Sequence, residues 1–125
     1  MTSKRILIVD DEADIREVAQ VSLELVGQFE VLTAGCGRDA IARARADRPD
    51  AILLDVMMPD MDGPTTLAQL QSDPATRDIP VVFLTAKAQT AERTRLAELG
   101  AAGILTKPFD PLRLAADVSA ALNWN

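Results

Sequence analysis

Short apolar runs alternate along the chain with longer segments whose apolar residues recur at helical spacing. Each run is at most six residues long and contains β-branched residues, which favours strands over helices. The five predicted strands are RILIVD (5–10), FEVLTA (29–34), AILLD (51–55), PVVFLT (80–85) and AGILT (102–106). Four of these runs are continuously apolar, as strands are when helices cover both faces of a parallel sheet. The run at 29–34 alternates more with polar residues, which favours an edge position.

The segment after the first strand predicts an amphipathic helix over residues 14–26. Asp14 and Glu17 form a capping pair at its start, and Gly27 ends it. The residues at helical spacing are Ile15, Val18, Ala19, Ser22, Leu25 and Val26.

Four further helices are predicted in the later segments. One covers residues 38–46, and another begins near Pro64, because proline is tolerated in the first turn. A third covers residues 90–99 and ends at Gly100. Asp110 and Pro111 open the last helix, whose expected inner face consists of Leu112, Leu114, Ala115, Val118 and Leu122.

A strand followed by a helix therefore recurs five times. Strict alternation of this kind implies a parallel sheet with helices on both faces. Five strands are too few for a closed eight-fold barrel, so we predict an open doubly wound α/β sheet of the flavodoxin-like type, with strand order 2-1-3-4-5. The length of 125 residues suits a single domain over 1–125.

The amino-acid composition narrows the range of possible functions. The net charge of −6 argues against non-specific binding to nucleic acid or to anionic membrane. No apolar run is long enough to span a bilayer. Cys36 is the only cysteine, so no internal disulfide can form, and we expect a cytoplasmic protein whose cysteine is a small packing residue. The chain has no histidine, so its chemistry must use carboxylates, hydroxyls, lysine or backbone groups.

Polar residues that could bind a ligand or take part in a reaction gather where the predicted strands end. Asp10 and Asp11 follow the first strand, Asp55 ends the third, Thr85 ends the fourth and Lys107 follows the fifth. In the order 2-1-3-4-5 the first and third strands flank the reversal point, where open sheets bind ligands. Clustered carboxylates repel one another, and Mg²⁺ with its preference for oxygen ligands removes that repulsion. With a hydroxyl and an ammonium opposite, the set predicts metal-assisted phosphoryl transfer to an aspartate.

Four fragments carry a family resemblance over essentially the whole chain. They are VDDE after the first strand, LLDVMMPDMDG around the third, FLTA at the fourth and LTKPF at the fifth. Through them the sequence resembles the receiver domain of two-component response regulators. The resemblance implies that Asp55 accepts a phosphoryl group. It also implies that Asp11, Asp55 and the Met57 backbone carbonyl bind Mg²⁺ directly, while Asp10 acts through water.

The resemblance also implies how such a domain would switch. Lys107 would pair with Asp55 and then with its phosphate, and the Lys107–Pro108 bond would be cis. The Thr85 hydroxyl would follow the phosphoryl group and move the loop after the fourth strand. One departure stands out, because Ile104 occupies the position where the family usually has an aromatic ring coupled to the threonine.

The resemblance names classes of partner. The phosphodonor would be a phosphohistidine on a sensor histidine kinase or a histidine phosphotransfer protein. The output would be altered binding of a downstream protein target or effector domain through residues 88–122, as a monomer or a phosphorylation-dependent dimer. Direct binding to nucleic acid or membrane is not expected. The chain favours a stand-alone regulator, and an excised receiver domain stays open as the alternative.

Rival interpretations of the same residues are weaker. A phosphatase of the haloacid dehalogenase type needs a second acid two residues after the nucleophile, where this chain has Met57. A binding module that never uses its phosphate site would not need the full residue set. Asp60 and Asp62 are interpreted as turn residues, with Gly63 supplying a positive φ. A calcium EF-hand loop is rejected, because its first and twelfth positions would be Met58 and Gln69.

Overall fold

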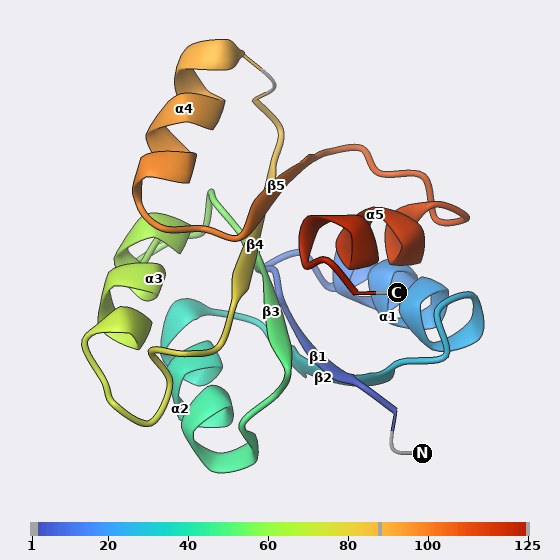
Figure 1. The fold of residues 1–125 in the computed structure, drawn as a ribbon, viewed down its shortest axis with the longest axis horizontal. Helices are drawn as coiled ribbons and strands as arrows, with labels where there is room; N and C mark the ends of the chain where they lie inside the picture. The colour runs from blue at the N-terminus through green and yellow to red at the C-terminus, as the bar shows by residue number, and fades with distance from the viewer. Residues whose placement is uncertain (1–2, 88, 125) are drawn as a thin grey trace.

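The computed structural model describes residues 3–87 and 89–124 and shows five strands and five helices in strict alternation (Figure 1). The strands are β1 (Arg5–Val9), β2 (Glu30–Ala34), β3 (Ala51–Asp55), β4 (Val81–Thr85) and β5 (Gly103–Thr106). The helices are α1 (Ala13–Leu25), α2 (Gly37–Asp47), α3 (Gly63–Gln71), α4 (Thr90–Glu98) and α5 (Leu114–Ala121).

All strand pairs are parallel, and the sheet has the order β2-β1-β3-β4-β5. This confirms the predicted topology, including the edge position of β2. β3 lies between β1 and β4, so the end of β3 faces the point where the strand order reverses.

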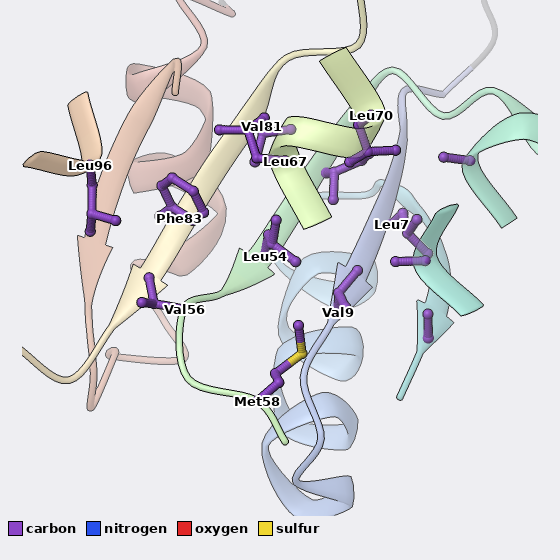
Figure 2. Packing of buried hydrophobic residues seen from close by; sticks show 14 residues of the cluster. Leu7, Val9, Leu54, Val56, Met58, Leu67, Leu70, Val81, Phe83 and Leu96 are labelled. Carbon is purple, nitrogen blue, oxygen red and sulfur yellow. The ribbon is translucent and has the colours of Figure 1, made fainter. Parts of the chain in front are cut away.

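The helices cover both faces of the sheet, α2, α3 and α4 on one and α1 and α5 on the other (Figure 1). Successive strand residues point to opposite faces, so each strand supplies both hydrophobic clusters. Leu7, Leu54 and Phe83 pack beneath α2–α4 (Figure 2), and their neighbours Ile8 and Leu53 pack beneath α1 and α5. This double coverage explains why the central strands are continuously apolar.

The prediction for α1 was wrong in its capping and in part of its buried face. Glu12 is the N-cap, and no side chain caps the helix, so Asp14 and Glu17 form no capping box. The buried residues of α1 are Ala19, Ser22 and Leu23, whereas Val18, Leu25 and Val26 are exposed. Small residues lie inside because α1 also packs against the α5 region, where the Ser22 hydroxyl donates to the Pro111 carbonyl.

The last helix also differs from its prediction, because α5 begins at Leu114 rather than directly after Asp110. Asp110 instead caps a turn, in which its side chain accepts a hydrogen bond from the Leu112 amide at 2.9 Å. Leu112 is therefore 77% exposed rather than part of the inner face. Leu114, Ala115 and Val118 are buried as predicted.

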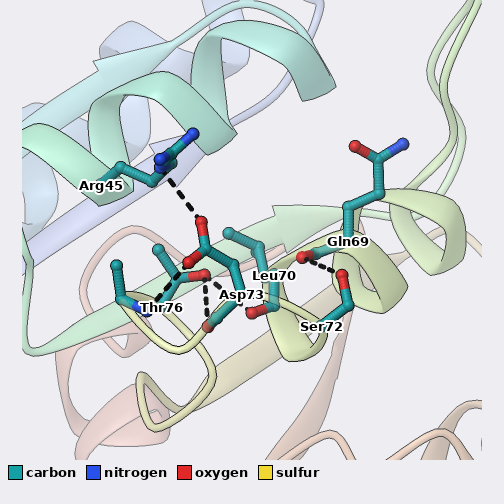
Figure 3. Close-up of polar contacts among 7 residues, drawn as sticks. Arg45, Gln69, Leu70, Ser72, Asp73 and Thr76 are labelled. Atoms are coloured by element: carbon teal, nitrogen blue, oxygen red, sulfur yellow. Dashed lines mark hydrogen bonds and ion pairs between the residues drawn. The ribbon is translucent and has the colours of Figure 1, made fainter.

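The connection from α3 to β4 is held by local polar contacts (Figure 3). The Thr76 hydroxyl donates to the Leu70 carbonyl at 2.7 Å, and Asp73 pairs with Arg45 of α2 at 3.0 Å. These contacts tie α2 to α3 at the end of the sheet opposite the predicted site. In the described part of the chain, no helix has the length and hydropathy that crossing a membrane requires.

Candidate functional site

The parallel sheet brings the predicted carboxylates together. Asp55 is the last residue of β3, and Asp10 directly follows β1, the neighbouring strand. Both residues are buried, while Asp11 at the start of the next turn is exposed. One carboxylate oxygen from each of these three residues lies within 4.8 Å of the other two. The structure therefore assembles the acid cluster that the strand ends predicted.

Lys107 reaches this cluster from the loop after β5. Its ammonium lies 2.8 Å from Asp10 Oδ2 and 3.1 Å from Asp55 Oδ1, and its side chain is only 14% exposed. The following bond to Pro108 is cis, as the resemblance implied. Lys107 thus bridges two buried carboxylates and provides the positive charge that they share.

Burial and the surrounding charges shift the protonation of this group. Burial raises the pKa of Asp55 to about 6, with Lys107 opposing the rise and Asp10 adding to it. Burial alone would lower the pKa of Lys107, but its hydrogen bonds to Asp10 and Asp55 raise that pKa above its ordinary value. Near neutral pH the lysine is therefore charged, and Asp55 is largely a carboxylate.

We predict that, because of this raised pKa, Asp55 contributes less to the stability of the metal-free protein at neutral pH than in mild acid. A carboxyl whose pKa is higher in the folded state binds its proton more tightly there, so its stabilising effect is complete at low pH. That effect is lost as the pH rises from about 4 to about 6, and the cost is on the order of 2 kcal/mol. Urea unfolding in EDTA at pH 4.5 and pH 7 measures it, relative to Asp55→Asn. Equal pH slopes for the two proteins would refute the assignment.

The donor set suits a small hard cation. Asp10 Oδ2 is buried, and the Lys107 ammonium lies beside it at 2.8 Å. Across residues 3–87 and 89–124, no amide or side chain donates to the Met57 carbonyl. Three clustered carboxylates supply the oxygen ligands that Mg²⁺ accepts, with waters completing its shell. The residues present therefore fit Mg²⁺.

The turn between β3 and α3 corrects one sequence prediction. The positive φ belongs to Asp60, at 67°, and not to Gly63. Gly63 is needed for a close approach instead, because a Cβ there would lie 2.5 Å from the Asp55 carbonyl oxygen. Asp62 caps α3 by accepting from the Thr65 amide at 2.9 Å, and hydrogen bonding by the Thr65 side chain and then by its amide lowers the pKa of Asp62. Asp60 and Asp62 are thus turn and cap residues.

Thr85 and Ile104 lie on the strands beyond Asp55. Thr85 is buried at the end of β4, and its hydroxyl accepts a hydrogen bond from the Lys87 amide at 3.0 Å. Within the described residues, the Thr85 hydroxyl forms no hydrogen bond with Asp55 or Lys107, while the Thr85 backbone carbonyl accepts one from the Lys107 amide at 2.8 Å. Ile104 pairs with Phe83 across β4 and β5 and packs against the core.

Two groups that contact Asp10 were not predicted from the sequence. The Glu12 amide donates to Asp10 Oδ1 at 2.9 Å, and Arg16 Nη1 donates to the Asp10 backbone carbonyl at 2.6 Å. A lone arginine in the first turns of an amphipathic helix carries no sequence signal for such a contact. The spacing is the one available hint, since Asp10 directly follows β1 and Arg16 lies near the start of α1.

Comparison with known proteins agrees with this geometry. The family profile described as the response regulator receiver domain matches residues 6–119. Response regulator PleD of Caulobacter vibrioides is 49% identical over 118 residues, which cover 93% of this chain and 25% of PleD. The phosphate regulon transcriptional regulatory protein PhoB of Pseudomonas aeruginosa is 43% identical over 122 residues, covering 98% of this chain and 53% of PhoB.

Solved structures show the same fold. The chemotaxis protein CheY4 of Vibrio cholerae superposes with a TM-score of 0.88 at 32% identity, covering 96% of this chain and 99% of that one. The chain spans about half or less of the length of the curated relatives that it matches. The profile match, the fold and the assembled strand ends together show that this chain belongs to the response regulator receiver domain family, the phosphorylation-activated phosphoacceptor switches of two-component signalling.

Proposed function

We propose that Asp55 is the phosphoacceptor of this receiver domain, over residues 1–125. A carboxylate oxygen of Asp55 attacks the phosphorus of a donor phosphohistidine, a P–O bond forms, and the P–N bond breaks so that the imidazole leaves with its electron pair. The observation that carries this proposal is the buried position of Asp55 at the end of β3, within 3.1 Å of the Lys107 ammonium. Lys107 then pairs with the phosphoryl oxygens by charge-assisted hydrogen bonds.

The acid cluster would hold Mg²⁺ through Asp11, Asp55 and the Met57 carbonyl, with Asp10 acting through water. When bound, the cation neutralises charge on the transferring phosphoryl group. Lys107 keeps the two buried carboxylates close together, and Asp11 is the exposed member of the cluster.

Acetyl phosphate, a small phosphodonor, tests the proposal without a partner. The protein with Mg²⁺ should gain the mass of one phosphoryl group, and EDTA should prevent the gain. If the protein gains no mass with Mg²⁺ present, the phosphoacceptor proposal fails.

A phosphatase of the haloacid dehalogenase type remains the enzymatic alternative. Met57 occupies the position of its second acid, is 65% exposed and has no titratable proton to give or take. We therefore propose that the domain promotes only its own phosphorylation and dephosphorylation. Steady turnover of a phosphomonoester by the isolated protein would favour the alternative.

Thr85 would convert phosphorylation into a change of conformation. Its hydroxyl now binds the Lys87 amide, so turning toward a phosphoryl oxygen breaks that bond and releases the loop after β4. We predict that Thr85→Ala still gains a phosphoryl group, while hydrogen exchange of the Lys87 amide no longer responds to beryllofluoride with Mg²⁺. Thr65→Ala, which alters a threonine in the α3 cap, is the control and should respond as the wild type does. A wild-type exchange response in Thr85→Ala would contradict this role.

The released loop leads into the face that we propose for output, residues 88–122. It comprises α4, β5 and α5, and its first residue, 88, lies outside the described residues. A downstream protein target or an effector domain of a longer regulator would bind here, and phosphorylation could also pair two copies through it. The sensor kinase as phosphodonor and the downstream target stay predictions. The cytoplasmic location and the oligomeric state of the protein also stay predictions.

A second surface, which lies mainly along α1 and overlaps residues 88–122 at Lys107, Phe109 and Leu112, suits the phosphodonor. Val18, Val21 and Leu25 expose an aliphatic face along α1, which continues to Leu112. Toward the acid cluster, Val18 lines a hollow together with Lys107 and Phe109. Because this apolar surface reaches Lys107, which contacts Asp10 and Asp55, we propose that the phosphohistidine-bearing partner docks on it.

Val18→Glu tests this docking surface. The side chain is already half exposed, so the protein should fold and accept phosphate from acetyl phosphate as before. Phosphotransfer from the most active member of a panel of purified sensor kinases should slow roughly tenfold, which corresponds to about 1.4 kcal/mol. Leu99→Glu makes the same change at the end of α4 and should leave transfer unaffected. Equal rates for both variants would contradict the surface.

A further inference from the structure

We propose that Arg16 is a positioning residue for the cation site. Its guanidinium fixes the Asp10 backbone carbonyl and so sets the geometry in which Asp10 and Asp11 meet Mg²⁺. The inference rests on the proposed function, since it concerns the same cation.

The contact replaces a missing strand partner. The Asp10 amide donates to the Ala34 carbonyl at 3.2 Å, which is the last bond between β1 and the β2 side of the sheet. β2 ends at Ala34, and the chain then turns into α2, so no strand amide is available to the Asp10 carbonyl. Arg16 Nη1 supplies the donor at 2.6 Å.

That carbonyl controls the relative placement of two acid residues. It belongs to the planar peptide unit that joins Asp10 to Asp11, so rotating it rotates the backbone of Asp11. The Asp10 side chain is held separately, by the Glu12 amide at 2.9 Å and the Lys107 ammonium at 2.8 Å. Among the described residues, Arg16 is the only hydrogen-bond donor to the Asp10 carbonyl.

The surroundings of Arg16 indicate that it acts as a hydrogen-bond donor rather than as the ionic partner of a carboxylate. The side chain is half-buried, and no carboxylate of the described chain pairs with it. Gly35 leaves room for the guanidinium, because a Cβ at that position would lie 3.3 Å from Nη1. A positive charge beside a cation site repels Mg²⁺, so charge and hydrogen bonding predict opposite effects of its removal.

Calorimetric titration of metal-free protein with Mg²⁺ separates the effect of the Arg16 charge from the effect of its hydrogen bond. Positioning predicts that Arg16→Ala weakens Mg²⁺ binding roughly tenfold, the low end for residues that orient metal ligands. The matched control is Arg43→Ala on α2. Arg43 lines the same hollow as Arg16 but pairs with Asp47 at 2.7 Å, so its removal should leave Mg²⁺ affinity unchanged.

Two further variants keep the test decisive. Arg16→Met retains the aliphatic stem without a donor and replaces Arg16→Ala if that variant does not fold. Arg16→Lys retains one donor and should bind Mg²⁺ more tightly than the variant that lacks one. Wild-type or tighter affinity without the donor, or no recovery in Arg16→Lys, overturns the inference. If the wild type itself binds no Mg²⁺, the proposed cation site fails instead.

Discussion

Asp55→Asn should reduce phosphoryl uptake from acetyl phosphate to the detection limit. The amide is nearly the same size as the carboxylate but has no anionic oxygen to attack phosphorus, and losing the nucleophile of such a site costs orders of magnitude in rate. The variant should fold, because the substitution leaves the backbone unchanged and the buried amide can still contact Lys107. Intact mass spectrometry after incubation with acetyl phosphate and Mg²⁺ measures the loss.

The matched control for this variant is Asp60→Asn in the following turn. Asp60 is exposed, and its φ of 67° lies in the left-handed region, which asparagine also adopts readily. The Asp60→Asn variant should therefore gain a phosphoryl group at the wild-type rate. Uptake by Asp55→Asn at that same rate would remove Asp55 from the reaction.

Lys107→Ala should have the second-largest effect, on both stability and uptake. Its removal leaves the buried carboxylates of Asp10 and Asp55 without their shared cation. Breaking a buried ion pair in this way costs about 3 kcal/mol, and losing one donor to the transferring group slows reaction roughly a hundredfold. Urea unfolding in EDTA at pH 7 measures the first effect, and acetyl phosphate uptake measures the second.

Lys87→Ala is the control for charge, because Lys87 is exposed in the nearby loop and touches neither carboxylate. It should unfold at nearly the wild-type urea concentration. The destabilisation of Lys107→Ala should also shrink near pH 4.5, where protonation of Asp55 removes part of the repulsion. Equal stability of Lys107→Ala and wild type in EDTA would contradict the bridging role.

The fold and most of the site could be predicted because few topologies satisfy the pattern. Continuously apolar strands alternating with helices leave an open parallel sheet, and parallel strands place all their carboxyl ends at one edge. That single fact brings Asp10, Asp55 and Lys107 together without knowledge of any distance. The cis bond before Pro108 followed from the resemblance and not from composition.

Features that depend on packing between distant segments could not be predicted. Two apolar stripes run along α1, and contact with the sheet and with α5 together decides that Ala19 and Leu23 are inside while Leu25 is 76% exposed. The glycine at position 63 serves a close approach to the Asp55 backbone rather than a left-handed turn. Arg16 was missed because its partner is a backbone carbonyl, which has no side-chain identity to recognise.

Locating the phosphoryl group on the chain tests the role of Asp55 most directly. The protein is incubated with acetyl phosphate and Mg²⁺, the acyl phosphate is trapped by borohydride reduction, and the peptides are mapped by mass spectrometry. Reduction should occur at Asp55 alone, and no residue should be reduced when EDTA is present. A phosphoryl group on another residue, or the same yield without Mg²⁺, would contradict that role.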